Sequence, residues 1–142
     1  MLVKVVAAVL MNNDIIFLPR RAETLKSKPG LLEFPGGKVE EGESNVIALA
    51  RELKEELSIR VNPNDIEDFE GNYLTTDKIE LSAYFVKKWE GDLILNSEIN
   101  SEIVSMNINN LYTVDDLLET DKKFIPSILN HLKKDSLKLQ KN

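Results

Sequence analysis

The sequence predicts an α/β protein in which β-strands alternate with two longer helices. Residues 2–10 form an apolar run typical of a strand, and residues 15–20 follow after an Asn-Asn-Asp turn. Residues 44–57 contain no Gly or Pro and repeat apolar residues at helical spacing. Residues 66–89 then return to strand patterns around a turn at Thr76 and Asp77. This alternation indicates the α/β class.

The later elements follow the same reasoning. Pro19 places the second strand at a sheet edge or a strand end. The other predicted elements are a short strand at 31–34, strands at 66–75 and 78–89, a short strand at 103–108, a capped helix start at 113–116 and a final helix at about 122–133. We expect the Lys-rich residues 134–142 to be frayed.

Length and composition restrict the class of protein. The chain of 142 residues, 42% hydrophobic and 30% charged, predicts one globular domain spanning 1–142. The lack of cysteine excludes disulfides and thiolate metal sites, and a single histidine excludes a His-based zinc site. A net charge of −6 argues against nucleic-acid polymers as partners. No apolar run has membrane-spanning length and no signal-peptide cleavage site is evident, so we expect a cytoplasmic protein without a membrane partner.

The predicted helix at 44–57 carries a ridge of carboxylates. Each helical residue advances by about 100°, which places Glu52, Glu55 and Glu56 within an arc of roughly 100°. A separate apolar arc faces the core and comprises Val46, Ala50, Leu53 and Leu57. Ser44 is a candidate N-cap.

Three neighbouring carboxylates repel one another unless a cation lies among them. Oxygen ligands alone favour a hard cation, Mg²⁺ or Mn²⁺, over zinc. The alternative interpretation is a solvated acidic helix face.

The surrounding residues favour the cation site. The pattern resembles the Nudix box, Gly-x5-Glu-x7-Arg-Glu-apolar-x-Glu-Glu-x-Gly-apolar. The matching residues are Gly37, Glu43, Arg51, Glu52, Leu53, Glu55, Glu56 and Ile59. Ser58 replaces the second glycine of the box, so the helix ends either in a strained left-handed residue or in another way.

The resemblance implies a Nudix-type α/β/α sandwich with a mixed sheet, and a loop–helix–loop box that binds metal. Glu52, Glu55 and Glu56 would hold Mg²⁺ (or Mn²⁺) with a carbonyl of Gly36 or Gly37. Glu98 would approach from a later loop, with Glu102 as the second choice, or either acid belongs only to a surface loop. Glu55 or Glu98 would be the catalytic base.

The wider run LEFPGGKVEEGES resembles the MutT-type subgroup, which hydrolyses nucleoside triphosphates including oxidised dGTP. The resemblance implies that Arg21, rather than Arg20, and Lys38 touch phosphates. Phe34 would lie near the base pocket or in the core. Asp121 would read the base, cap the last helix, or do both. Glu43 and Arg51 would form a structural ion pair that braces the loop.

We therefore expect a Nudix hydrolase that converts a nucleoside triphosphate to a monophosphate and pyrophosphate, with 8-oxo-dGTP as the leading substrate. CTP, dCTP or another nucleoside diphosphate derivative is the alternative. A Nudix domain that only binds a nucleotide or a partner is a second alternative, which metal-dependent turnover would exclude. Either a monomer or a homodimer is compatible with the sequence.

Overall fold

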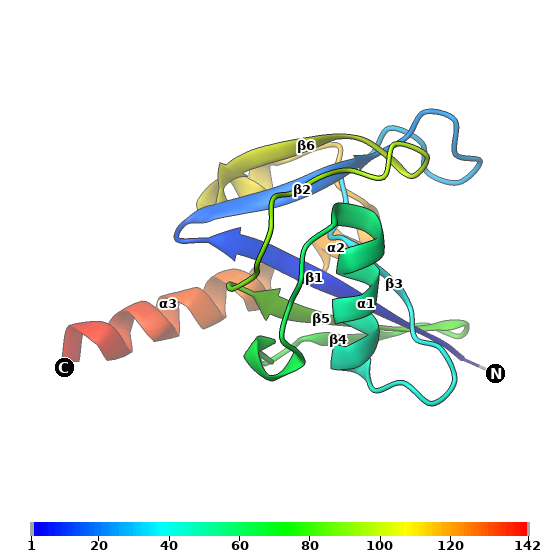
Figure 1. Ribbon diagram of the computed structural model, residues 1–142. Helices are drawn as coiled ribbons and strands as arrows, with labels where there is room; N and C mark the ends of the chain where they lie inside the picture. Colours follow the sequence, from blue (N-terminus) through cyan, green and yellow to red (C-terminus); the bar gives the residue numbers. More distant parts are fainter. Residues whose placement is uncertain (1, 142) are drawn as a thin grey trace.

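The computed structural model describes residues 2–141 and has helices on both faces of a mixed sheet (Figure 1). The strand order is β4–β5–β1–β2–β6, and β3 pairs with β1. The strands are β1 (Val3–Asn12), β2 (Ile15–Arg21), β3 (Gly36–Lys38), β4 (Tyr73–Thr75), β5 (Ile79–Val86) and β6 (Asn100–Asn107). The helices are α1 (Asn45–Leu57), α2 (Glu119–Lys122) and α3 (Ile125–Lys141), with 3-10 helices η1 (Pro63–Asp65) and η2 (Ile108–Thr113).

The central strand β1 is buried on both faces. One set of alternating residues packs with Leu49, Leu53 and other side chains of α1, and the other set packs with Ile125 and Ile128 of α3. Successive side chains of a strand point to opposite faces, so an apolar run such as β1 serves both cores. This layering confirms the predicted α/β/α sandwich.

The strands β1 and β2 pair only beside the turn that joins them and diverge away from it. Their residues pair only at Met11–Ile16 and Asn12–Ile15, while β1 pairs in parallel with β5 along eight residues. Figure 1 shows β2 and β6 diverging from β1, β4 and β5. Residues 31–38 bridge the two halves, because the Ala8 amide donates to Pro35 O at 2.8 Å and the Glu33 amide donates to Pro19 O at 3.0 Å.

Two predicted strands are shorter than expected. Residues 31–34 form only isolated bridges at Leu32, and the regular strand is β3, which begins just after Pro35. Pro35 lacks the amide hydrogen that a continuous ladder would need. Of residues 66–75, only Tyr73–Thr75 forms β4, because Gly71 turns the chain at a φ of 83°.

The C-terminal third also differs from expectation. Residues 113–116 do not start a helix, because η2 ends at Thr113 and the Asp116 carboxylate pairs with Arg20 instead of capping. The helix at 122–133 is replaced by the short α2 and the longer α3, which continues through Lys141. Residues 134–141, where we expected a frayed end, lie within α3, and residue 142 lies outside the described residues.

Both ends of α1 follow local chemistry. The Ser44 hydroxyl accepts a hydrogen bond from the Ile47 amide at 3.3 Å, which confirms the predicted N-cap. Ser58 adopts the left-handed conformation, with φ 62° and ψ 21°. Its amide donates to Lys54 O at 3.1 Å, so the helix ends as it would with glycine despite the steric cost.

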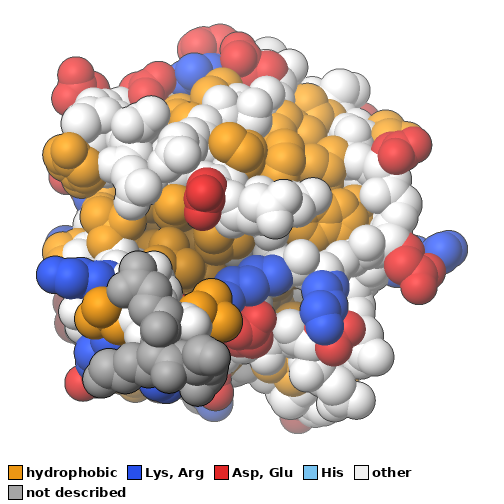
Figure 2. Space-filling model, turned by 90° about the vertical axis from the view of Figure 1, so that its left-hand side faces the viewer, with side chains coloured by type: hydrophobic (Ala, Val, Ile, Leu, Met, Phe, Trp, Pro, Cys, Tyr) orange, Lys and Arg blue, Asp and Glu red, His pale blue; other side chains and the backbone are white. Residues whose placement is uncertain are grey.

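The surface contains a hollow whose lining residues all lie outside α1. It has a volume of about 880 Å³ and lies between the β1–β2 turn and the second half of α3. Figure 2 shows hydrophobic side chains across this end of the molecule, with charged ones scattered among them. Among the described residues no helix combines the length and hydropathy needed to span a membrane.

Candidate active site

The glycine pair of β3 lies directly against the acidic face of α1. A β-carbon on Gly37 would lie 2.6 Å from both carboxylate oxygens of Glu52, so any other residue at this position would displace the Glu52 carboxylate. The Gly36 backbone faces the Glu56 carboxylate and lowers its pKa, against the larger opposite effect of burial. The turn after Phe34 thus brings backbone groups close to two glutamates of α1.

Arg51 forms ion pairs with acids of α1 and of the loop before it. Its Nε and Nη2 bind the two Glu43 oxygens at 2.7 and 2.9 Å, and Nη2 also donates to Lys38 O at 3.0 Å. Its Nη1 contacts Glu52 at 3.0 Å and Glu55 at 3.3 Å. Arg51 therefore ties the loop before α1 to the helix and draws two of the three carboxylates of the helix ridge, Glu52 and Glu55, toward itself.

No ion pair among the described residues involves the third carboxylate of the ridge, Glu56. Its side chain is 8% exposed, and burial together with the charges of Glu33 and Glu52 raises its pKa to about 8. Burial also raises the pKa of Glu52, against the opposing effect of Arg51. Ionisation of Glu56 is therefore unfavourable here, and a nearby cation would make it more favourable.

The donor set fits a hard divalent cation. Its available atoms are carboxylate oxygens and backbone carbonyls, which suit Mg²⁺ and Mn²⁺. Within residues 2–141 no three acidic side chains are already gathered at metal-binding distances. Arg51 accounts for this, because Glu52 and Glu55 turn toward its guanidinium and would have to leave it to bind a cation with Glu56.

The loop that carries Glu98 is docked on the end of α1. The Asn96 amide donates to Glu56 O at 3.0 Å, and the Ile94 amide donates to Leu57 O at 2.9 Å. The Asn96 side chain in turn accepts from the Glu98 amide at 3.2 Å. Glu98 itself is exposed. Glu102 lies on β6 and pairs with Arg20 at 3.4 Å.

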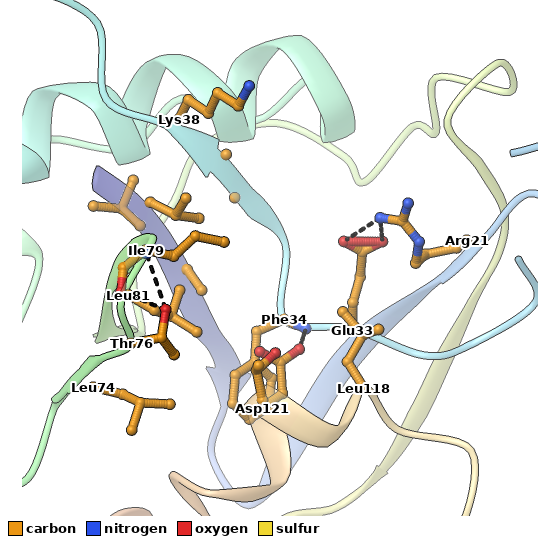
Figure 3. Close-up of a pocket in the computed structure, with 16 residues that line it drawn as sticks. Arg21, Glu33, Phe34, Lys38, Leu74, Thr76, Ile79, Leu81, Leu118 and Asp121 are labelled. Carbon is orange, nitrogen blue, oxygen red and sulfur yellow. Dashed lines mark hydrogen bonds and ion pairs between the residues drawn. The ribbon is translucent and has the colours of Figure 1, made fainter. Parts of the chain in front are cut away.

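A pocket of about 330 Å³ continues from the glycine pair toward α2 (Figure 3). In Figure 3, the side chains of β4, β5 and their turn lie opposite Phe34, Leu118 and Asp121. The lining residues include four predicted substrate-binding residues and both glycines. They are Val5, Val6, Ala7, Arg21, Glu33, Phe34, Gly36, Gly37, Lys38, Leu74, Thr76, Ile79, Leu81, Leu118, Thr120 and Asp121.

Asp121 is the buried acid of this pocket. It is 3% exposed, and its Oδ2 accepts a hydrogen bond from the Phe34 amide at 2.9 Å. Burial, with a further contribution from Glu33, raises its pKa to about 7. Asp121 lies within α2 and does not cap the last helix, so that alternative is wrong. Phe34 belongs to the core and also lines the pocket, which joins the two roles considered for it.

The two neighbouring arginines of β2 have different surroundings. Arg20 binds Asp116 at 2.7 Å and Gly30 O at 2.9 Å, away from the pocket lining. Arg21 lines the pocket and binds Glu33 and the backbone of the loop that follows β2. Lys38 lines the same pocket next to α1, far from Asp121 in Figure 3.

Sequence reasoning missed Glu33 and the apolar wall formed by Leu74, Ile79 and Leu81. A sequence feature could have identified Glu33 as a site residue, because it is charged and stands between two apolar residues, Leu32 and Phe34, which are buried in the structure. No sequence feature distinguishes the apolar wall, since apolar strand residues are expected in any core.

The fold agrees with comparisons to known proteins. A family model described as the NUDIX domain matches residues 1–132. The chain therefore belongs to the Nudix family. Among solved structures, the solution structure of the Escherichia coli ORF135 protein superposes with a TM-score of 0.75 at 28% identity, covering 91% of this chain and 89% of that one. A structure from a study of MutT of Aliivibrio salmonicida and Vibrio cholerae gives a TM-score of 0.76 at 26% identity, covering 92% and 98%.

Two curated relatives carry different substrate names. The 8-oxo-dGTP diphosphatase of Escherichia coli (strain K12) is 41% identical over 83 residues, which are 57% of this chain and 62% of the relative. The CTP pyrophosphohydrolase of the same strain is 36% identical over 92 residues, 65% of this chain and 67% of the relative. The chain thus spans about three-fifths of the first relative and about two-thirds of the second.

Proposed function

We propose that this chain hydrolyses a nucleoside triphosphate to a nucleoside monophosphate and pyrophosphate, with Mg²⁺ as the cofactor and Mn²⁺ as a substitute. The observation that carries the proposal is the continuity of the site. One pocket runs from a buried acid, Asp121, to the glycine pair that packs against Glu52 and Glu56. A nucleotide bound along it would place its base at Asp121 and its phosphates beside the acidic helix.

The carboxylates Glu52, Glu55 and Glu56, a carbonyl of Gly36 or Gly37, and Glu98 would hold the cation. When bound, the cation neutralises phosphate charge and makes a water molecule more acidic. Glu55 or Glu98 accepts the proton of the water that attacks phosphorus, and the bridging oxygen leaves with the departing phosphate group. Arg21 and Lys38 bind phosphate oxygens, where negative charge is concentrated during the transfer.

Phe34 and Asp121 form the base subsite in this proposal. An ionised Asp121 accepts hydrogen bonds from N–H groups, and guanine presents such donors; 8-oxoguanine adds one at N7. The 8-oxo-dGTP diphosphatases among the relatives support this substrate. A site built on hydrogen bonds discriminates strongly, because a wrong base leaves buried polar groups unpaired.

A specific observation also favours CTP or dCTP as the second candidate. Asp121 has a pKa raised to about 7, so a protonated carboxyl is accessible near neutral pH. A protonated carboxyl both donates and accepts, which matches the N3 acceptor and N4 donor of cytosine. The relative named CTP pyrophosphohydrolase is consistent with this reading.

A substrate panel tests the proposal. The wild-type protein is assayed with Mg²⁺ on 8-oxo-dGTP, dGTP, CTP, dCTP, ATP and nucleoside diphosphate derivatives, and pyrophosphate and phosphate are measured separately. We expect pyrophosphate from 8-oxo-dGTP. Faster turnover of CTP or dCTP than of any guanine nucleotide would establish the second candidate. Asp121→Ala should lower kcat/KM for the preferred base and spare poor substrates, whereas a metal-site defect would lower all alike.

A further inference from the structure

Glu33 is a pocket acid that the proposed mechanism leaves without a role. Its side chain is 13% exposed, and both its carboxylate oxygens face Nη1 of Arg21, at 3.3 and 3.4 Å. Figure 3 shows the two side chains pointing toward each other at one side of the pocket.

The rest of the Arg21 guanidinium is held by the loop before Leu31. Nε donates to Lys28 O at 3.1 Å, and Nη2 donates to Ser27 O at 2.8 Å. Loop carbonyls thus bind the edge of the guanidinium formed by Nε and Nη2, and Glu33 binds the remaining nitrogen, Nη1. A guanidinium has five N–H groups in a rigid plane, so this set fixes its orientation and leaves an N–H on Nη2 for a ligand.

Glu33 lies in a position where a negative charge is unfavourable. Its charge raises the pKa of Glu56 on one side and of Asp121 on the other. Burial raises the pKa of Glu33 itself, while Arg21 lowers it. A carboxylate between an acidic helix and a phosphate-binding pocket would repel phosphates on its own. Pairing with Arg21 offsets that repulsion, which explains how a carboxylate is accommodated at this position.

A buried ion pair is weak evidence for stability, because desolvation offsets much of the attraction. Its geometric effect is stronger, since two oxygens facing one guanidinium nitrogen define a direction. Without Glu33, the Arg21 guanidinium would keep only its contacts with Ser27 O and Lys28 O. It would then be free to turn toward that loop and away from the pocket.

We propose that Glu33 is a positioning residue that directs the Arg21 guanidinium into the pocket toward the substrate phosphates. This inference rests on the phosphate-binding role proposed above for Arg21. Glu33 does not touch the substrate in this account and acts through Arg21 alone.

A double-mutant cycle tests the coupling, with Glu33→Ala, Arg21→Ala and the double variant. The substrates are 8-oxo-dGTP and CTP with Mg²⁺, and kcat/KM is measured on the faster one. Glu33→Ala should lower kcat/KM by about tenfold or more, chiefly through KM. In the Arg21→Ala background the same change should cost less than about twofold, because no guanidinium remains to be directed.

Three comparisons make the result specific. Glu33→Gln keeps an oxygen that accepts from Nη1, so it should stay within about threefold of wild type. Glu90→Gln breaks the exposed Arg60–Glu90 pair, which is 3.0 Å long and distant from the pocket lining, and should leave kcat/KM unchanged. Should Glu33→Ala fail to fold, Glu33→Met fills the same space without a comparable acceptor and enters the cycle in its place.

The Kd for inorganic tripolyphosphate, measured by calorimetry across the same cycle, gives a readout independent of turnover. We expect the same coupling in Kd. Multiplicative effects of the two changes in both measurements would show that Glu33 acts independently of Arg21 and would overturn the inference. If Arg21→Ala alone changes neither kcat/KM nor Kd, the inference fails with the role of Arg21. If wild type hydrolyses neither nucleotide, the proposed function fails, and the Kd cycle still decides the role of Glu33.

Discussion

The Arg51 guanidinium binds both carboxylate oxygens of Glu43, from Nε at 2.7 Å and from Nη2 at 2.9 Å. The pair joins the loop after β3 to the helix that carries the acids. It also lowers the pKa of the Glu43 carboxyl. The geometry supports the bracing role expected from the sequence over a direct contact with substrate.

Replacing Arg51 by alanine should lower both the melting temperature and kcat/KM, the latter by at least about tenfold. The loop would lose its anchor, and a small displacement of positioned groups is costly for catalysis. Arg51→Lys keeps the charge but loses the two-point contact, and should fall between wild type and Arg51→Ala. An unchanged melting temperature with lost activity would indicate instead that Arg51 contacts the substrate.

Addition of Mg²⁺ should raise the melting temperature of the wild-type protein. A cation that binds only the folded state stabilises it, and here it would also relieve repulsion among Glu52, Glu55 and Glu56. Glu56→Gln should show less than about half of this increase, because one carboxylate is gone. Equal increases in both proteins, measured by calorimetry at matched ionic strength, would place the cation elsewhere.

Asp121 should make the protein less stable as the pH rises. Its folded-state pKa of about 7 lies above the unfolded value of about 4. Its contribution to stability is therefore complete below about pH 4 and is lost as the pH rises to about 7. The charged groups that face it are Glu33 and Arg21.

Asp121→Asn keeps the oxygen that accepts from the Phe34 amide and removes the titration. The difference in melting temperature between wild type and Asp121→Asn should therefore change steadily from pH ~4 to pH ~8, to the disadvantage of wild type. Parallel curves over this range would show that Asp121 is already ionised or is not buried in solution.

A matched comparison should distinguish Glu98, which lies in a loop, from Glu102, which lies on β6. Glu98→Gln should lower kcat by at least about tenfold, because its loop is docked on α1 beside Glu56. Glu102→Gln loses a partly exposed pair with Arg20 and should change kcat by less than about twofold. The reverse ranking, measured on the same substrate with Mg²⁺, would assign the catalytic role to Glu102.

Local signals explain what the sequence predicted. The helix that carries the acids and its Ser44 cap follow from short-range spacing, and so does the glycine pair. The double burial of β1 was visible because its residues are apolar on both faces. The family resemblance supplied the layers and the ligand set.

Long-range contacts explain what the sequence could not predict. The Asp121 carboxylate meets the Phe34 amide across 87 residues of chain, and the Arg20–Asp116 pair spans 96. Contacts between residues so far apart produce no periodic pattern in the sequence. From the sequence alone, both Asp116 and Asp121 therefore resembled helix-capping residues. Glu33 was passed over because its ion-pair partner, Arg21, lies on β2 and is not a neighbour in the sequence.

The catalytic rate of Glu56→Gln tests the central claim most directly. The variant is compared with wild type on the best substrate at saturating Mg²⁺, and Glu41→Gln, an exposed acid outside the site, is the control. Its kcat should be at least about 100-fold lower than that of wild type, as expected when a metal ligand is lost. The melting temperature should not fall, because removal of like-charge repulsion does not destabilise α1. Turnover close to wild type in a folded Glu56→Gln protein would contradict the assignment of α1 as the metal-binding element.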